Sequence, residues 1–145
     1  NPLSVSIQMD GRMTYADEDA GSEVRQWQWN ASSLDFLEAL IQTTGSRTGQ
    51  QKFYQRRDAQ DIVASGNNTY SPGINVPFNI ASRHGSTFIN GAVDGTALTA
   101  NTTPTALPDL STTDLNLAYD YMGTIKTFRM WADDLGDEGI EEASS

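Results

Sequence analysis

Hydrophobic and polar residues alternate one by one in several short stretches of this chain. Residues 3–9 read Leu-Ser-Val-Ser-Ile-Gln-Met, so every second side chain is apolar. Residues 24–29 read Val-Arg-Gln-Trp-Gln-Trp and are expected to form a strand with Trp27 and Trp29 on one face. Successive side chains of a β-strand point to opposite faces of a sheet, so this pattern predicts strands that have one face in a core.

Turn-forming residues separate these stretches at intervals of about 8–12 residues. Among them, Asn90-Gly91 and Asp94-Gly95 are dipeptides typical of hairpins. The spacing gives roughly ten short strands, which predicts an all-β fold and, within that class, an antiparallel β-sandwich. The side chains expected in its core are Leu3, Val5, Ile7, Phe78, Ile80, Leu115, Leu117, Ile125 and Trp131.

Three further segments need more than alternation to interpret. Residues 32–43 have apolar side chains at helical spacing, and Ser32 with Asp35 fits a helical capping box. We expect a strand there, because the elements around it are strands. Residues 123–131 are expected to form a central strand, and the acidic residues 134–143 one short C-terminal helix.

Composition and charge narrow the classes of protein and partner. The chain has 145 residues, the size of one ordinary domain. Its net charge of −10 argues against nucleic acid and anionic membranes as partners, because both attract clustered Lys and Arg. No apolar stretch approaches the length of a membrane span, so membrane insertion is not expected.

Two features bear on the origin of the chain. It contains no Cys, which favours bacteria or their viruses over a small secreted animal domain. Asn1 stands directly before a strand-like run. We therefore expect residues 1–145 to form a single domain that is part of a longer polypeptide.

The second half of the chain holds three stretches that are informative together. Residues 70–73 read Tyr-Ser-Pro-Gly, with Val-Pro-Phe-Asn-Ile-Ala at 76–81, and residues 86–91 read Ser-Thr-Phe-Ile-Asn-Gly. Residues 123–131 read Gly-Thr-Ile-Lys-Thr-Phe-Arg-Met-Trp, with Leu135 and residues 140–143 after them. This set resembles the concanavalin A-like, laminin G-like domains of bacteriophage virion proteins. Residues 132–134 depart from the family pattern: they are Ala-Asp-Asp where the family has Pro-Arg-Arg, which reverses the local charge.

The resemblance implies a jelly-roll sandwich that serves as a structural or binding module of a virion, as tail fibre, spike or capsid decoration. The implied partners are other virion subunits, copies of the same chain in a homo-oligomer, and a host-surface glycan. The implied location is the virion. The sequence leaves a second hypothesis open, which is a secreted carbohydrate-binding module of a bacterial cell-surface protein or enzyme.

No enzymatic activity is expected. Sandwich enzymes that cleave glycans carry carboxylates that alternate on one strand face, and none of the predicted strands has that pattern. His84 is the only His and is expected in a polar surface turn, so a Ser-His-Asp triad has little support.

Candidate glycan-binding residues come from two predicted strands. Tyr54 and Arg56 share a strand face, Arg57 follows directly, and Trp27 or Trp29 is expected nearby. Aromatic faces stack on sugar rings, and Arg offers a fork of donors to hydroxyl or acidic groups. The alternative is that the Trp side chains pack in the core and the Arg side chains pair with surface carboxylates.

Ca²⁺ is the one cofactor for which the chain offers candidate ligands. The resemblance implies that a Ca²⁺ site at the sandwich rim would use loop carboxylates and carbonyls. Four loop acids are candidates, and no spacing in the chain fits an EF-hand. These candidates are Asp17, Asp19, Asp94 and Asp109.

Overall fold

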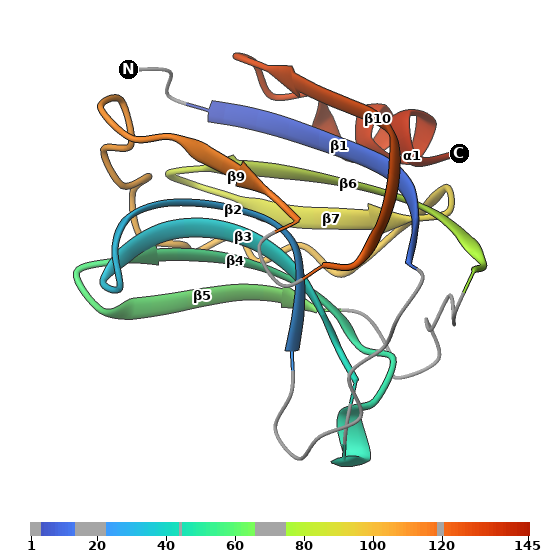
Figure 1. Ribbon diagram of the computed structural model, residues 1–145. Coiled ribbons are helices and arrows are strands. Elements are labelled where there is room, and N and C mark those ends of the chain that lie inside the picture. The colour runs from blue at the N-terminus through green and yellow to red at the C-terminus, as the bar shows by residue number, and fades with distance from the viewer. Residues whose placement is uncertain (1–3, 14–22, 44, 66–74, 119–120) are drawn as a thin grey trace.

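Two antiparallel five-stranded sheets pack face to face in the computed structural model (Figure 1), which describes residues 4–13, 23–43, 45–65, 75–118 and 121–145. The first sheet has the order β10 (Gly123–Trp131), β1 (Ser4–Met13), β6 (Pro77–Gly85), β7 (Ile89–Val93) and β8 (Thr96–Ala97). The second has the order β5 (Gln60–Ser65), β4 (Gln51–Arg57), β3 (Asp35–Gln42), β2 (Glu23–Ser32) and β9 (Leu115–Leu117). The predicted all-β sandwich is confirmed.

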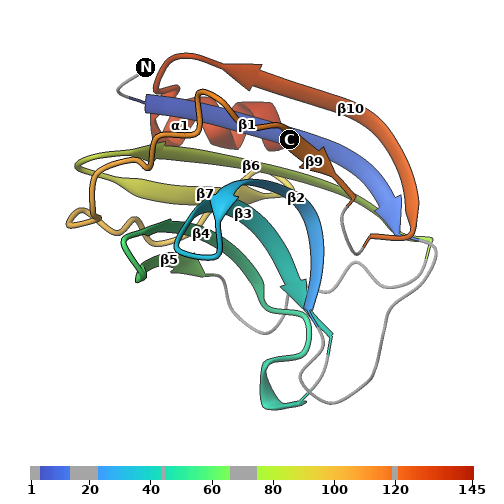
Figure 2. The same ribbon diagram turned by 60° about the vertical axis from the view of Figure 1, so that its left-hand side comes forward.

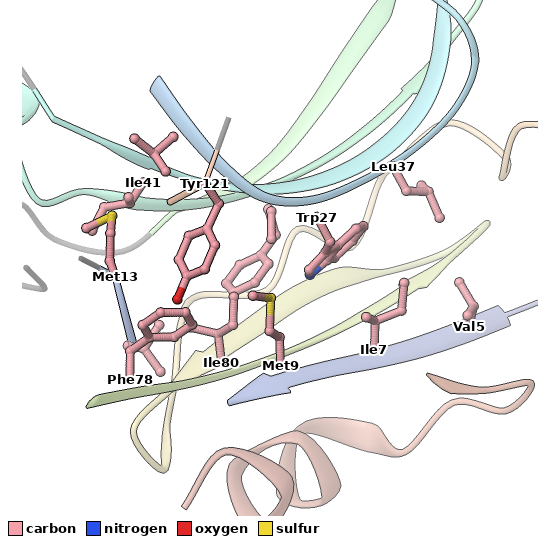
Figure 3. Close-up of a cluster of buried hydrophobic side chains, with 14 of the residues drawn as sticks. Val5, Ile7, Met9, Met13, Trp27, Leu37, Ile41, Phe78, Ile80 and Tyr121 are labelled. Atoms are coloured by element: carbon pink, nitrogen blue, oxygen red, sulfur yellow. The ribbon is translucent and has the colours of Figure 1, made fainter. Parts of the chain in front are cut away.

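The core lies between the two sheets. Figure 3 shows Val5, Ile7 and Met9 of β1 pointing toward Trp27 and Leu37 of the second sheet. All five are buried. The predicted burial of Val5, Ile7, Phe78 and Ile80 is confirmed, whereas Leu3 lies outside the described residues.

The helix-like spacing of residues 32–43 belongs to a strand, as expected. The central residues of β3 are buried on both faces, so apolar side chains occur at positions that alternation alone would leave polar. Ser32 and Asp35 form no capping box and instead hydrogen-bond in the turn between β2 and β3. There the Leu34 N–H donates to Ser32 Oγ at 3.0 Å, and Ser32 Oγ–H donates to Asp35 Oδ2 at 3.2 Å.

The prediction that residues 123–131 form a central strand is wrong. β10 is an edge strand that pairs only with β1 among the described strands, and β9 is the edge of the other sheet on the same side. An edge position leaves inward-facing side chains partly open to solvent, so Ile125 is 36% exposed and Leu117 41%. Leu115 is half-buried and packs against the core. Trp131 is half-buried too, but it pairs with Ser6 and lies on the outer face of its sheet, so the core assignments of Ile125, Leu117 and Trp131 are wrong.

Asn90-Gly91 and His84 were also misplaced by the sequence pattern. Asn90-Gly91 lies inside β7 and is not a hairpin turn, whereas Asp94-Gly95 does form the turn between β7 and β8 with φ of 46° and 77°. His84 belongs to β6 and is fully buried, not in a surface turn.

The α-helix α1 (Gly136–Ser144) lies on the outer face of the first sheet (Figure 2). Ile140 is its buried apolar anchor and packs on Ala81 and Ala92. Arg83 of β6 pairs with Asp134 at 2.9 Å and Asp137 at 2.9 Å, so part of the acidic C-terminal segment neutralises a cation on the sheet. No helix in the described ranges is long and apolar enough to span a membrane.

Candidate functional site

The outer face of the second sheet is concave, because its long strands bend away from the first sheet (Figures 1 and 2). Within the described part of the chain, no helix lies on it. Strand register decides which side chains reach this surface, which we call the concave face. They include Arg25, Gln28, Asn30, Phe36, Glu38, Lys52, Tyr54, Arg56 and Asp61.

Glu38 is the centre of a polar cluster on this face. Its Oε2 accepts hydrogen bonds from Arg25 Nε at 3.0 Å and from Gln28 Nε2 at 2.9 Å. Glu38 is only 4% exposed, and burial raises its pKa while Arg25 and Gln28 oppose that rise. Both partners are thereby fixed in direction, which prepares them to meet a ligand without further ordering.

Arg56 is held by three neighbours. Its Nε lies 3.0 Å from Asp61 Oδ1, its Nη1 donates to the Ser33 carbonyl at 3.1 Å, and its guanidinium lies 5.6 Å from the centre of the Phe36 ring. The result is a planar cation within cation–π range of an aromatic ring, beside the Glu38 cluster.

A shallow groove of about 430 Å³ joins the two groups. Its lining consists of Arg25, Gln28, Asn30, Ser32, Ser33, Phe36, Glu38 and Arg56. Further along β4, Lys52 Nζ lies 6.0 Å from the centre of the Tyr54 ring. Burial lowers the pKa of Lys52 and raises that of Tyr54. Planar amide, guanidinium and carboxylate groups next to aromatic rings are suited to hydroxyl-rich ligands.

The structure brings two of the predicted glycan-binding residues, Tyr54 and Arg56, onto the concave face. Trp27 does not belong there: it faces the core and is fully buried, because its strand position points inward. Trp29 also faces inward, and its indole N–H donates to the Thr113 carbonyl at 3.2 Å. Arg57 donates to the Leu107 carbonyl at 3.4 Å, away from the groove.

Of the groove residues, sequence reasoning named only Arg56 as a candidate and missed the rest, among them Arg25, Gln28, Phe36 and Glu38. One signal was present. If Trp27 and Trp29 face the core, then the residue between them, Gln28, has to face outward. Which residues of β3 lie beside it depends on strand pairing, which no single segment reveals.

The four candidate calcium ligands are not gathered into a site by the described residues. Asp17 and Asp19 lie outside the described ranges. Asp94 Oδ1 accepts the Asn79 N–H at 3.0 Å in the turn after β7. Asp109 Oδ1 accepts the Ser111 N–H at 3.1 Å, and hydrogen bonds from Ser111 lower its pKa. Among the described residues, no three His, Asp or Glu side chains cluster as metal ligands would.

No family model and no curated protein sequence matches this chain. Solved structures do resemble it. The CBM40 module of Ruminococcus gnavus IT-sialidase, bound to alpha2,6 sialyllactose, superposes with a TM-score of 0.73 at 12% identity over 99% of this chain and 84% of its own. The leech intramolecular trans-sialidase gives 0.72 at 14% identity over 99% of this chain and 23% of its own. The binding domain of botulinum neurotoxin serotype D gives 0.70 at 11% identity over 97% and 36%. Likeness at such low identity shows the fold alone: this chain is a concanavalin A-like jelly-roll sandwich.

Proposed function

We propose that this domain is a carbohydrate-binding module without catalytic activity, carried by a secreted or cell-surface protein, and that it binds sugar on the concave face. The observation that carries the proposal is the groove in which Arg25, Gln28 and Arg56 are fixed in direction beside Phe36. Preorganised planar donors next to an aromatic ring provide hydrogen bonds to hydroxyl groups and an apolar contact for a sugar ring.

The distribution of charge also favours sugar binding on the concave face. The chain carries nine Lys and Arg against 19 Asp and Glu. On this face the numbers are balanced, because Arg25, Lys52 and Arg56 stand beside Glu23, Glu38 and Asp61. An acidic sugar is therefore repelled less here than an evenly spread charge of −10 would suggest.

The comparisons support the glycan hypothesis over the virion hypothesis. The Ruminococcus gnavus CBM40 module is described with bound alpha2,6 sialyllactose, and a second structure of it with alpha2,3 sialyllactose. The descriptions of the similar structures give no link to a virion. The carbohydrate-binding module is thus the better supported of the two hypotheses.

Replacing Arg56 is expected to weaken sugar binding. A glycan array probed with the labelled domain, followed by titration with sialyllactose, identifies the sugar. Arg56→Ala and Gln28→Ala should then each raise the Kd by about tenfold or more, since each removes a fixed donor. The sugar should be recovered unchanged after incubation with the wild-type domain.

Arg57→Ala is the matched control. It removes the same side chain one residue further along the strand, where the side chain turns away from the groove. It should leave the Kd unchanged. Equal losses in the Arg56 and Arg57 variants, or release of a cleaved sugar, would contradict the proposal.

Assembly with other copies of the chain is a second candidate, and one observation favours it. Ile125 and Met130 of β10 are exposed on the open side of the sandwich, as are Leu117 and Met122 nearby. A long edge strand with apolar side chains is suited to antiparallel pairing about a two-fold axis.

Charge introduced on this edge is expected to abolish such pairing. If the wild-type domain forms a dimer, Met130→Glu should convert it to a monomer in light scattering across a concentration series. Arg57→Glu, on another strand, is the control and should leave the dimer intact. A wild-type domain that remains monomeric at every concentration would contradict this candidate.

A further inference from the structure

A second polar groove lies on the opposite side of the molecule, between the helix α1 (Figure 2) and the strands β1 and β10. It encloses about 520 Å³, within the range of about 300–1,000 Å³ found for small-molecule sites. The side chains that matter for recognition come from all three elements and from β6. They are Gln8, Asn79, Arg129, Trp131 and Glu142.

The floor of this groove carries a buried acceptor without a partner. Gln8 is only 2% exposed, and its Oε1 accepts no hydrogen bond from the described residues. Its Nε2 donates to Asn79 Oδ1 at 2.7 Å.

The orientation of both amides is determined by their neighbours. Asn79 Nδ2 donates to the carbonyls of Ala143 at 3.2 Å and Ser145 at 3.1 Å, so this atom has to be the nitrogen. Asn79 Oδ1 is then the acceptor for Gln8 Nε2, and Gln8 Oε1 is the atom left over. An unmet buried acceptor is costly, and a donor on a bound molecule satisfies it.

Donors and a flat ring lie around this acceptor. Arg129 is the direct neighbour of Gln8 across the β1–β10 pair, and Trp131 is next on the same face. Neither the Arg129 guanidinium nor the Trp131 indole N–H has a hydrogen bond or ion pair within the described part of the chain. Lys126 is paired with Asp10 at 3.1 Å, so Arg129 and Glu142 remain as one positive and one negative group.

We infer that this groove is a second carbohydrate-binding site, selective for a neutral saccharide. Hydroxyl groups donate to Gln8 Oε1 and Glu142 and accept from Arg129, while the Trp131 ring packs on the apolar side of the sugar. The equal number of positive and negative groups favours an uncharged ligand. The domain would then bind sugar from both outer faces, and this site does not depend on the concave face.

Nuclear magnetic resonance tests the site directly, because the chain has three Trp and hence three indole N–H signals. Trp27 is buried in the core and Trp29 donates to Thr113, so both serve as internal references. The probes are glucose, galactose, mannose and N-acetylglucosamine, with N-acetylneuraminic acid as the acidic probe. At least one neutral sugar should shift the Trp131 indole and the Gln8 amide together and saturably, with Trp131→Phe assigning the signal.

Variants separate this groove from the concave face. Arg129→Ala, which changes an exposed side chain, and Gln8→Met, which removes the acceptor at similar volume, should each raise the Kd for that sugar about tenfold. Arg56→Ala should leave it unchanged, and Arg129→Ala should leave any binding on the concave face unchanged. The inference is overturned if no neutral sugar shifts the Trp131 signal, if only the acidic sugar does, or if Arg129→Ala binds as tightly as wild type.

Discussion

Acidification from pH 7 to about pH 4.5 is expected to lower the free energy of unfolding by about 2–3 kcal/mol through His84. Burial lowers the pKa of His84 to about 3 in the folded domain, from 6.5 in an ordinary environment. Below pH 6.5 the unfolded chain takes up a proton that the folded chain does not. Stability is therefore lost progressively as the pH falls from about 6.5 toward 3.

The surroundings of His84 explain why it stays neutral. Its ring packs edge-on against Trp27, with 5.9 Å between ring centres, and its Nε2 lies 3.1 Å from Ser82 Oγ. Its Nδ1 has no hydrogen-bond partner among the described residues. Protonation would place a charge in the core between the sheets without a carboxylate to balance it.

Urea unfolding at a series of pH values, in wild type and His84→Gln, isolates this contribution. The variant keeps a polar side chain beside Ser82 but has no titratable group. Its stability should fall less steeply with acid, and the difference between the two curves should grow by about 1.4 kcal/mol per pH unit well below 6.5. Parallel curves would contradict a buried neutral imidazole.

Wild type has to be compared with His84→Gln because Glu38 also contributes to the pH dependence of the free energy of unfolding. Burial raises the pKa of Glu38 in the folded domain, so its contribution has the opposite sign and favours the folded state at low pH. The effect is common to wild type and His84→Gln and cancels in the difference between them.

Much of the fold was predictable because each strand carries its own signal. Alternation in residues 3–9 gave β1, and its apolar side chains do face the core. The strand at residues 35–42 required context, because a strand buried on both faces has no alternation to show. Local pattern therefore identified the strands without identifying their neighbours.

Strand pairing explains why the predictions for Ile125 and His84 were wrong. Ile125 alternates as a core residue does, yet its strand lies at an edge, and position in a sheet is not encoded in the strand itself. His84 was assigned to a turn because polar residues and Gly85 surround it, whereas the strand continues through Gly85. Pairing with β1 and β7 keeps His84 in a strand, although the residues around it favour a turn.

The candidate site was hidden by an irregularity of β2. Arg25 and Gln28 are three residues apart, so strict alternation would place them on opposite faces. The register shifts between Arg25 and Trp27, and this bulge brings Arg25 and Gln28 to the same carboxylate on β3. A bulge depends on the neighbouring strand, so the cluster around Glu38 emerges only in the folded sheet.

Gly91→Ala is expected to destabilise the domain by about 3 kcal/mol, although it adds one methyl group. Gly91 lies in β7, where its backbone passes directly over the Phe53 ring of the other sheet. A Cβ atom at position 91 would overlap Phe53 Cδ2 and Cε2. Phe53 is fully buried, so its ring has no free space into which to move, and the sheets have to separate locally.

Gly136→Ala is the control for backbone effects. It adds a methyl group with nothing within 4 Å, at a residue whose φ is +71°, so it carries conformational strain without a packing clash. Its expected cost is about 1 kcal/mol. Gly91→Ala should therefore be the more destabilising of the two in urea unfolding.

A double variant tests the mechanism. Phe53→Leu removes the ring that the new methyl group would meet, so Gly91→Ala with Phe53→Leu should lose at least about 1 kcal/mol less than the sum of the single variants. Additivity within about 0.5 kcal/mol would show that Gly91 is required for another reason, such as its backbone conformation in β7. The expected coupling would show that a glycine in a strand interior is needed here for the close approach of two sheets.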